Sequence, residues 1–476
     1  MAQRERISLI RNILIFLIAS VFLFFGPALA ATASYLTYQR DYAYQASEAD
    51  SKLSCRAIAL EQVKRLLLEE LGTYMESRTE VRNYQVSRDQ VIAMTAGIVS
   101  AEILSEKWDG QTYVIVARIT ADPKQVARAI DELRGERQSL NELEASKQRT
   151  DELLKELAKL REDLKSAKEG QQAQDRIDYQ ATIQRLSAID WFKEGYALAA
   201  SRKYREAISF YSKAIDADPD YANAYSARGF AHFRMNGYQQ SLKDVNRALD
   251  LKSDHAGALV NRARTLSAMK KFDKALADVN RAIELKPDFA QAYNIRASIY
   301  LNLRNNWKAL EDCNRAIELK PNFAAAYYHR GAAQRNMRRF DNAFKDFQRA
   351  IEIDPDDPRP YQQRGWTYHR MKKYNEAVRD FNRALELDPT FVTAIYRRGL
   401  VLYELRLFQE ALRDFSNAIE LDKDYADAYY QRALCYQRLG QTEAAAGDLR
   451  RAAQLGHAQA QRAIKDRKPL PYEVDD

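Results

Sequence analysis

Apolar and small residues recur in the C-terminal half of the chain with a period of 34 residues. In units of 34 numbered from Ala188, position 27 is alanine in all eight units, and position 20 is alanine in seven. Position 8 is always glycine or alanine, and position 4 is aromatic in six units. This pattern predicts stacked helix pairs over residues 188–459, because small residues let two helices approach closely and rings fill the remaining space. Proline at position 32 of five units is expected to end the second helix.

A different pattern precedes the repeats, where apolar residues at steps of three and four give way to short β-type runs. The elements predicted there are a helix at 51–75, a strand at 79–85, a short helix at 87–94, strands at 98–108 and 112–120, and a helix that starts at Pro123. Asp109-Gly110 is a strong turn signal between the last two strands. The order α-β-α-β-β-α predicts a small α/β module over residues 51–125.

Residues 126–187 are rich in Glu, Lys, Arg, Leu and Gln, which predicts a long charged helix. The residues with coiled-coil spacing are Thr150, Leu153, Leu157, Leu160, Leu164 and Ala167. One interpretation is a parallel homo-oligomer through residues 150–167. The other is a solvated helix, or one that folds back on its own chain, because short isolated seams are marginal. Gly170 is expected to interrupt the helix.

The N-terminus has the features of an export signal. Three arginines precede an apolar run at 13–25, and the small residues Ala28-Leu29-Ala30-Ala31 follow. We expect cleavage after Ala30. The alternative is an uncleaved membrane anchor, because no charged residue occurs between Arg11 and Arg40. The organisation predicted for the chain is a signal or anchor at 1–30, a linker at 31–50, the α/β module at 51–125, the charged helix at 126–187, the repeats at 188–459, and a capping helix and tail at 460–476.

Composition narrows the function further. The net charge of +8 over 476 residues is mild, so it does not indicate a nucleic-acid-binding surface. Few glycines and prolines favour a mainly α fold. Three widely spaced cysteines predict neither a disulfide scaffold nor a zinc site. The five histidines have no metal-ligand spacing, and no nucleophile or phosphate-binding motif is present. The sequence therefore predicts a protein that is not an enzyme and takes no cofactor or metal.

The repeated pattern closely resembles the tetratricopeptide repeat family over eight repeats. That resemblance implies an α-solenoid, wound as a right-handed superhelix, whose concave groove binds a protein or peptide. The stretch from Ala96 to Gly110 resembles, more weakly, the N-terminal domain of some flagellar-assembly and outer-membrane lipoproteins of bacterial envelopes. That second resemblance implies envelope localisation and no chemistry.

One feature departs from the common repeat: position 7, often leucine, is arginine in seven units, and position 23 is aspartate in the same seven. In a helix hairpin that turns near position 15, both positions lie eight residues from the turn and are level with each other. We therefore expect seven arginine–aspartate pairs within the repeats, since the planar guanidinium can hold a carboxylate with two bonds. The alternative is a basic stripe for an acidic or nucleic-acid partner.

The family resemblance places the groove at positions 2, 5, 9, 12 and 13 of each first helix, which share one helical face. The candidate groove residues are Phe192, Tyr196, Phe230, Phe233, Tyr328, Arg335, Trp366, His369, Arg370, Tyr396, Tyr403 and Tyr430. Aromatic residues and arginine are enriched at binding hot spots. The alternative for each is packing against a neighbouring repeat. The paired Lys and Asn with which some family members hold a terminal carboxylate are absent.

The leading functional expectation is an exported scaffold or adaptor that binds another envelope protein in its groove, in the periplasm or anchored to the inner membrane. The second is a structural tether that oligomerises through residues 150–167. A third, assembly of a surface appendage or exported polymer, rests only on the weaker N-terminal resemblance.

Overall fold

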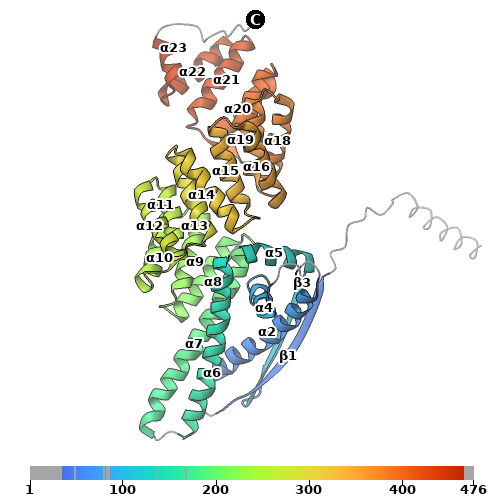
Figure 1. The fold of residues 1–476 in the computed structure, drawn as a ribbon, viewed down its shortest axis with the longest axis vertical. Coiled ribbons are helices and arrows are strands. Elements are labelled where there is room, and N and C mark those ends of the chain that lie inside the picture. Colours follow the sequence, from blue (N-terminus) through green and yellow to red (C-terminus); the bar gives the residue numbers. More distant parts are fainter. Residues whose placement is uncertain are drawn as a thin grey trace, which may run out of the picture. The chain divides into compact units, whose positions relative to one another are not determined.

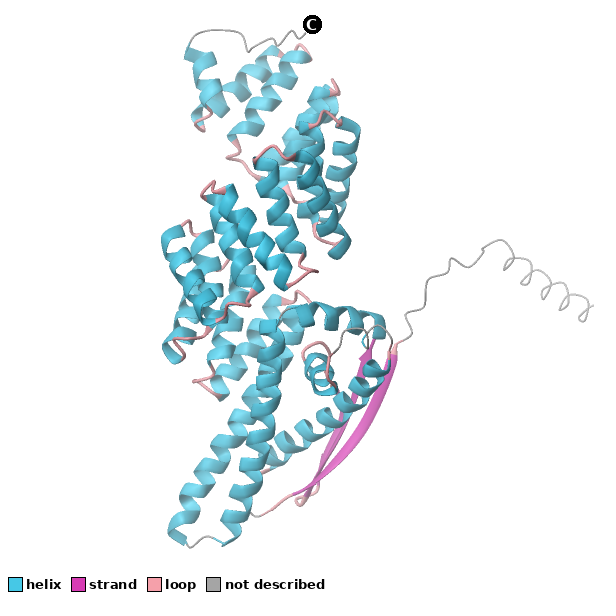
Figure 2. Cartoon of the chain, in the orientation of Figure 1, coloured by secondary structure: helices cyan, strands magenta, loops and turns pink. Residues whose placement is uncertain are grey.

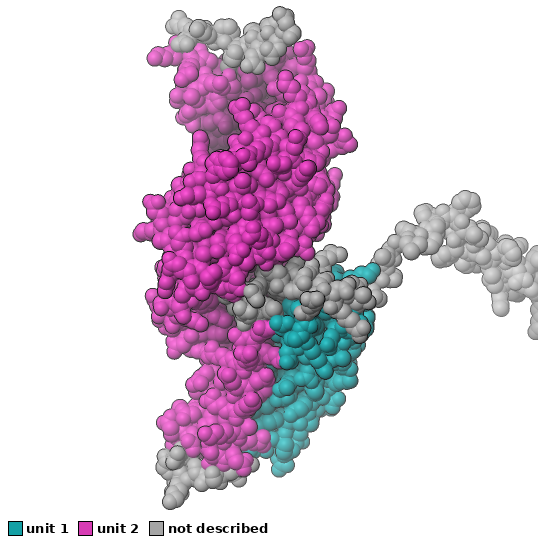
Figure 3. Space-filling model, viewed as in Figure 1, with its two compact units in different colours: residues 1–130 teal, residues 131–476 magenta. Residues whose placement is uncertain are grey.

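The computed structural model of the chain consists of two compact units, divided between Ile130 and Asp131 (Figures 1 and 3). The residues that the structure describes are 35–47, 50–78, 81, 86–135, 137–166 and 169–465. The predicted signal at 1–30, most of the predicted strand at 79–85 and the tail from residue 466 lie outside them. Figure 2 shows that strands are confined to the first unit, among the described residues.

The first unit is a three-stranded antiparallel sheet packed against helices. Its elements are β1 Leu36–Gln45, α2 Lys52–Ser77, α4 Arg88–Ala96, β2 Glu102–Trp108, β3 Thr112–Ala121 and α5 Pro123–Gly135, the last of which crosses the boundary between the units. The central strand is β3, where alternate residues such as Ile115 and Ala117 are fully buried. Val63 and Leu67 of α2 are buried as well and belong to the same small core.

The prediction of a linker at 31–50 is wrong, because β1 lies within it and pairs with β3 from Leu36 opposite Ala121 to Gln45 opposite Thr112. The charged pair Arg40-Asp41 in the middle of the segment hid the strand alternation. The structure places Arg40 at the exposed edge, where its Nη2 donates to Glu70 Oε1 at 2.6 Å. The sequence did contain one indication of the strand, because Tyr42 and Tyr44 are two residues apart and so lie on the same face of a strand.

The second unit begins with a helical hairpin formed by α6 Arg137–Ser166 and α7 Glu169–Ala200. Leu153, Leu157 and Leu164 of the predicted seam are buried in it. Tyr179 and Ile183 of α7 are also buried, and the two helices pack together. The alternative in which the helix folds back on its own chain is therefore correct, and these leucines are not available to a second copy. Gly170, which was expected to interrupt the helix, lies inside α7.

Eight helix pairs follow, and each consists of a first (A) and a second (B) helix, as the 34-residue period predicts (Figure 1). The A helices are the C-terminal part of α7, then α9 Ala222–Arg234, α11 Ala256–Ala268, α13 Ala290–Asn302, α15 Ala324–Asn336, α17 Pro358–Arg370, α19 Val392–Glu404 and α21 Ala426–Arg438. The B helices are α8 Tyr204–Ala217, α10 Tyr238–Leu251, α12 Phe272–Leu285, α14 Asn306–Leu319, α16 Phe340–Ile353, α18 Tyr374–Leu387, α20 Phe408–Leu421 and α22 Thr442–Gln454. A short helix, α23 Ala458–Lys465, closes the stack.

Two local features make each hairpin tight. The turn residue at position 15 has a positive φ in every repeat, near 60° at Lys270 for example, which reverses the chain in one step. Small residues at position 8 let the side chain at position 24 lie directly on the A helix: a Cβ atom on Gly331 would come within 2.8 Å of the Phe347 ring. The alanines at positions 20 and 27 are buried in the same way.

All seven predicted arginine–aspartate pairs are present, and each joins an A helix to the B helix of its own repeat. Arg296 is typical: its Nε and Nη2 donate to the two oxygens of Asp312 at 2.8 and 2.7 Å. The aspartates are buried, and the arginines keep only a small exposed fraction. The seven pairs are Arg228–Asp244, Arg262–Asp278, Arg296–Asp312, Arg330–Asp346, Arg364–Asp380, Arg398–Asp414 and Arg432–Asp448.

Each of these arginines also reaches the preceding repeat, which the spacing argument missed. The free Nη1 of Arg296 donates to Asn280 Oδ1 at 2.8 Å, and position 25 supplies an amide or hydroxyl oxygen in the other six cases too. One guanidinium therefore connects two helices of its own repeat to the B helix before it. We call these seven arginines, with their aspartates and the position-25 side chains, the arginine ladder.

Two histidines lie within the stack, of which His255 is buried and His329 half-buried. His255 begins α11, where its Nδ1 accepts a hydrogen bond from the backbone of Ala258 at 3.3 Å. His329 lies between A helices, 2.8 Å from Asn294 Oδ1. Burial lowers the pKa of His255 to about 4 and that of His329 to about 3. Both imidazoles are therefore neutral in the folded protein at neutral pH.

Replacing Arg296 by glutamine is expected to lower the free energy of unfolding by about 2–3 kcal/mol, because Asp312 is left buried without its cation. The measurement is urea unfolding followed by circular dichroism. The control is Arg281→Gln, whose exposed pair with Glu284 at 3.0 Å should be worth under about 1 kcal/mol. Equal losses in the two variants would contradict a structural role for the ladder.

Acidification should destabilise the repeats through His255. Its folded pKa lies below the unfolded value of about 6.5, so the unfolded chain binds the proton first, and stability present above that pH is lost as the pH falls towards 4. Between pH 7 and 5, His255 alone should account for about 1–2 kcal/mol of the loss, and His255→Asn, which keeps an N-cap acceptor, should remove that share. An unchanged pH dependence in that variant would show that His255 does not carry the effect.

Candidate binding face of the first helices

The twelve predicted groove residues all lie on A helices, but the structure divides them by position. Phe192 and Tyr430, both at position 5, are buried and cannot line an open surface, so the prediction is wrong for these two. Phe192 packs between Tyr211 and Tyr221, with ring centroids 5.8 and 5.2 Å away. Tyr430 stacks on His457 at 4.2 Å. At both ends of the stack, position 5 therefore packs against rings of its own repeat.

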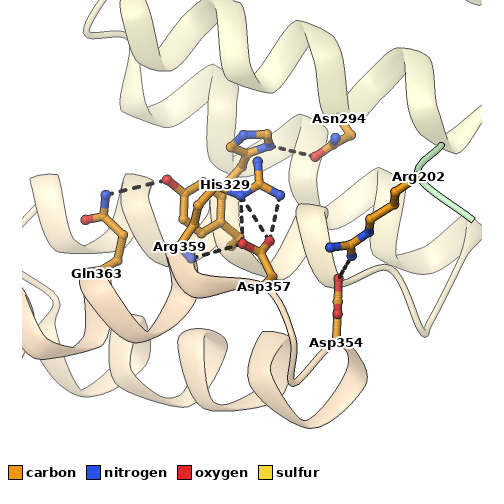
Figure 4. A network of polar contacts seen from close by, with 8 residues as sticks. Arg202, Asn294, His329, Asp354, Asp357, Arg359 and Gln363 are labelled. Carbon is orange, nitrogen blue, oxygen red and sulfur yellow. Dashed lines mark hydrogen bonds and ion pairs between the residues drawn. The ribbon is translucent and has the colours of Figure 1, made fainter. Parts of the chain in front are cut away.

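Position 5 in the middle of the stack forms polar contacts with position 6 of the next A helix. Asn294 and His329 are one such pair, and Gln363 Nε2 donates to Tyr328 Oη at 3.5 Å in the next (Figure 4). Tyr396 at the same position is half-buried, and its ring lies 4.8 Å from that of Tyr425. These contacts tie adjacent A helices together, and they leave positions 9, 12 and 13 as the more accessible part of the face.

One group of accessible rings lies on α9, in the second repeat. Phe230 and Phe233 are half-buried, and the Arg264 guanidinium from α11 lies 4.9 Å from the Phe230 centroid and 5.8 Å from that of Phe233. The Arg234 guanidinium lies 5.9 Å from the Phe230 centroid. Arg264 is at position 9 and Arg234 at position 13, both on the predicted face, but neither was among the predicted groove residues. Tyr196, one repeat earlier, lies 6.3 Å from Phe192.

A second group lies on α17 and α19, in the sixth and seventh repeats. Trp366 and His369 stack with their centroids 4.7 Å apart and an angle of 20° between the rings. Arg397 lies 4.9 Å from the Trp366 centroid. All three are half-buried, and Arg370 at the end of α17 is exposed. Arg397 was missed because it occupies position 6, outside the expected set.

Arginines on neighbouring A helices extend this second group. Arg335 donates to Gln363 Oε1 and to Asn336 Oδ1, the latter at 3.0 Å. Arg359 forms a two-pronged bond with Asp357, with the shortest contact at 2.6 Å, and lies 5.4 Å from the Tyr328 centroid (Figure 4). Arg359 and Gln363 were also missed. We call Arg335, Arg359, Arg370 and Arg397, with Trp366, His369, Tyr328 and Gln363, the arginine–aromatic patch.

Electrostatics in the arginine–aromatic patch are dominated by positive charge. Burial, followed by the charge of Arg335, lowers the pKa of Arg397 to about 10. Burial also lowers the pKa of Arg335. The pKa of His369 is lowered by burial and by Arg370 and Arg397. The patch therefore presents cations and flat rings together, a combination suited to binding an anion-bearing chain.

Farther along, Tyr403 of α19 accepts a hydrogen bond from Arg438 Nε of α21 at 3.1 Å.

Among the residues that the structure describes, no cluster of His, Cys, Asp and Glu is arranged to hold a metal ion. The cysteines Cys55, Cys313 and Cys435 are buried and form no disulfide with one another. In the described part of the chain, no helix combines the length and the apolar character needed to span a bilayer. The A-helix face therefore offers a surface for binding.

Comparison with known proteins agrees with this architecture. Four tetratricopeptide repeat family models match parts of the chain. One matches residues 290–323, 324–357 and 358–391, and a second matches residues 195–236 and 408–440. The third matches residues 256–289 and the fourth matches residues 427–455. Among curated proteins, no relative of the chain was found.

Among solved structures, the Cut9–Hcn1 heterotetramer of the APC/C superposes with a TM-score of 0.53 at 14% identity, covering 71% of this chain and 76% of that one. YrrB, described as a TPR protein with an unusual peptide-binding site, superposes with a TM-score of 0.33 at 25% identity. The match covers 39% of this chain and 97% of that one. The pilus biogenesis factor PilW superposes with a TM-score of 0.41 at 19% identity, and the match covers 44% of this chain and 98% of that one. The period, the helix pairs and the family matches agree, and the chain is a tetratricopeptide repeat protein.

Proposed function

We propose that this protein is a non-enzymatic adaptor that holds a partner protein or peptide against the A-helix face of its repeats. Proteins built from these repeats generally act as protein-interaction scaffolds. The observation that carries the proposal is the arginine–aromatic patch. Trp366, His369 and Arg397 stack on one another and stay half-exposed, which leaves rings and guanidinium groups facing solvent. Such side chains supply much of the binding energy at protein interfaces.

A role as a tether through residues 150–167 has less support. The leucines that would form the seam, Leu153 and Leu157 among them, are buried within the hairpin of α6 and α7. Opening that hairpin to accept a second copy would expose as much apolar surface as the new contact would cover. The A-helix face needs no such rearrangement, and this favours the adaptor.

The adaptor is tested by site-specific crosslinking in intact cells. A photoreactive residue at Trp366 should trap a discrete partner, because this ring lies on the proposed binding face. Trp307 is the matched control: its side chain is 64% exposed, and it lies at the start of the B helix α14. A partner trapped at Trp366 and not at Trp307 is the expected result. The same adducts at both sites, or adducts at Trp307 alone, would contradict the proposal.

We further infer that the adaptor works in the bacterial cell envelope, after export. The support is the order of residues 1–31, in which a basic segment, a short apolar run and small residues follow one another as in secretory signals. Cell fractionation with determination of the N-terminal residue tests it. Envelope protein that begins at Ala31 is the expected result, and an intact N-terminus in the membrane fraction would indicate the anchored form. Protein confined to the cytoplasm would overturn the inference.

A further inference from the structure

The two edges of the repeat stack carry opposite charge. One edge consists of the turns from each A helix to its B helix, at positions 14–16, and in the first seven repeats these 21 residues include ten lysines and arginines and no carboxylate. The other edge consists of the turns between repeats, where the 21 residues at positions 31–33 include nine aspartates and four lysines. We call positions 14–16 of repeats three to seven the basic edge, which comprises residues 269–271, 303–305, 337–339, 371–373 and 405–407.

The cations of the basic edge face solvent. All eight are exposed, and in the described part of the chain none of them forms an ion pair. Arg339 instead lies 4.9 Å from the Trp307 ring. The first repeat differs, because Arg202 of its turn pairs with Asp354 of the fifth repeat at 3.6 Å (Figure 4). The eight cations are Lys270, Lys271, Arg304, Arg338, Arg339, Lys372, Lys373 and Arg406.

The local backbone structure does not account for these cations. Position 15 has a φ near 60°, which glycine and asparagine adopt most easily, as at Asn236. Position 16 is the N-cap of the B helix, and Lys271, Arg339 and Lys373 occupy it without forming the side-chain hydrogen bond of a cap. The C-terminus of the A helix favours a cation at position 15, but the N-terminus of the B helix opposes one at position 16. Helix stability therefore does not explain a cation at both positions.

Large apolar side chains are exposed beside these cations. Of the five that are exposed in the described repeats, four lie at or next to a turn from an A helix to its B helix: Met235, Leu303, Trp307 and Leu407. Leu303 and Leu407 belong to the basic edge, and Trp307 lies in the first turn of α14 beside it. Tryptophan and leucine beside lysine and arginine are typical of surfaces that lie at the boundary between lipid headgroups and acyl chains.

The same features favour a membrane over other anionic partners. Single-stranded nucleic acid is held by stacking of bases on aromatic rings, and Leu303 and Leu407 offer none. A protein partner usually presents both signs of charge, whereas the basic edge has no carboxylate to match a cation. An anionic lipid surface attracts each lysine or arginine that lies near it, and it can take up apolar side chains at successive turns.

We propose that the basic edge docks on a membrane surface of anionic phospholipid. Its lysines and arginines lie at the headgroups, and Leu303, Trp307 and Leu407 enter the boundary between headgroups and acyl chains. The docking residues lie at the turns and are distinct from those of the arginine–aromatic patch. This docking goes beyond the proposed function, because it assigns a second ligand to a second surface.

Fluorescence from the basic edge tests the docking in the full chain. Leu303→Cys is labelled with the environment-sensitive dye nitrobenzoxadiazole, since the three natural cysteines are buried. Vesicles of phosphatidylcholine with about one-third phosphatidylglycerol should raise the emission at least about twofold, as the dye leaves water, and vesicles of phosphatidylcholine alone should not. An equal rise with both kinds of vesicle would contradict a role for the cations.

The matched control for this label is Leu421→Cys. Both leucines are 44% exposed, and Leu421 ends α20 at the opposite edge of the stack. Emission from the label at position 421 should not change with either kind of vesicle. No change at position 303, or equal changes at the two positions, would overturn the proposal.

Charge variants made in the chain labelled at position 303 locate the docking residues. Arg304→Asn with Arg338→Asn removes two cations and introduces a residue that suits a positive φ. The salt concentration that halves the emission change should fall at least about twofold, because fewer cations hold the edge to the lipid. The control is Arg315→Gln with Arg349→Gln, exposed arginines that pair with glutamates on B helices, which should leave that concentration unchanged. Equal falls in the two variants, or emission that does not depend on salt, would contradict the docking.

Other polyanions identify the kind of partner. Duplex DNA and polyglutamate are added to the labelled chain at the same concentration of negative charge as the anionic vesicles. Neither should change the emission as the vesicles do, because neither offers an apolar layer to the side chain at position 303. A change with DNA or polyglutamate that equals or exceeds the change with vesicles would overturn the assignment of a membrane.

The result is separable from that of the adaptor proposal. If the label at position 303 does not respond while crosslinking at Trp366 still traps a partner, only the membrane docking is lost. If the label responds and no partner is trapped, the adaptor role is lost and the docking surface remains. Trp307 faces lipid in the docked protein, so it still serves as the control for protein crosslinking at Trp366.

Discussion

The repeat stack depends on one interaction that recurs in seven of its eight units: an arginine on the A helix held between an aspartate and a side-chain oxygen. Arg296 shows the geometry, with Asp312 on its own B helix and Asn280 on the preceding one. A planar group with donors on both sides fixes the angle between two helices and the offset between two repeats at once. Leucine at this position, as in many repeats of the family, would fill space without specifying that offset.

This interaction separates the arginines of the chain into two classes. Those of the ladder face the interior of each helix pair, are neutralised there and add little to the external field. Those of the arginine–aromatic patch lie on the A-helix face, where Arg397 stacks on Trp366, Arg335 donates to Gln363 and Arg359 pairs with Asp357. Because the ladder supplies rigidity from within, the A-helix face is free to vary in sequence from repeat to repeat. The stability of each helix pair and the proposed binding surface thus depend on different residues of the same helices.

The sequence predicted the ladder because the 34-residue period has no insertion, so that positions 7 and 23 could be placed level with each other from the turn alone. It did not reveal the position-25 partners, since serine, asparagine and glutamine share a role there but no side-chain type. Phe192 and Tyr430 were misassigned because position 5 is buried in most repeats, as at Val260 and Asn294, and is half-buried only at Tyr328 and Tyr396. Arg397 was missed because its function depends on a neighbouring helix. Charged residues in the middle of β1 hid a strand whose pairing is long-range.

The central claim is that each ladder arginine couples neighbouring repeats, and a double-mutant cycle tests it most directly. Asn280→Ala, Arg296→Gln and the double variant are compared with the wild-type chain by urea unfolding. The account predicts a coupling energy of about 1 kcal/mol or more between the two side chains, since a hydrogen bond to a charged group joins them across repeats. Effects that add to within about 0.3 kcal/mol would show that the repeats stack independently of the ladder.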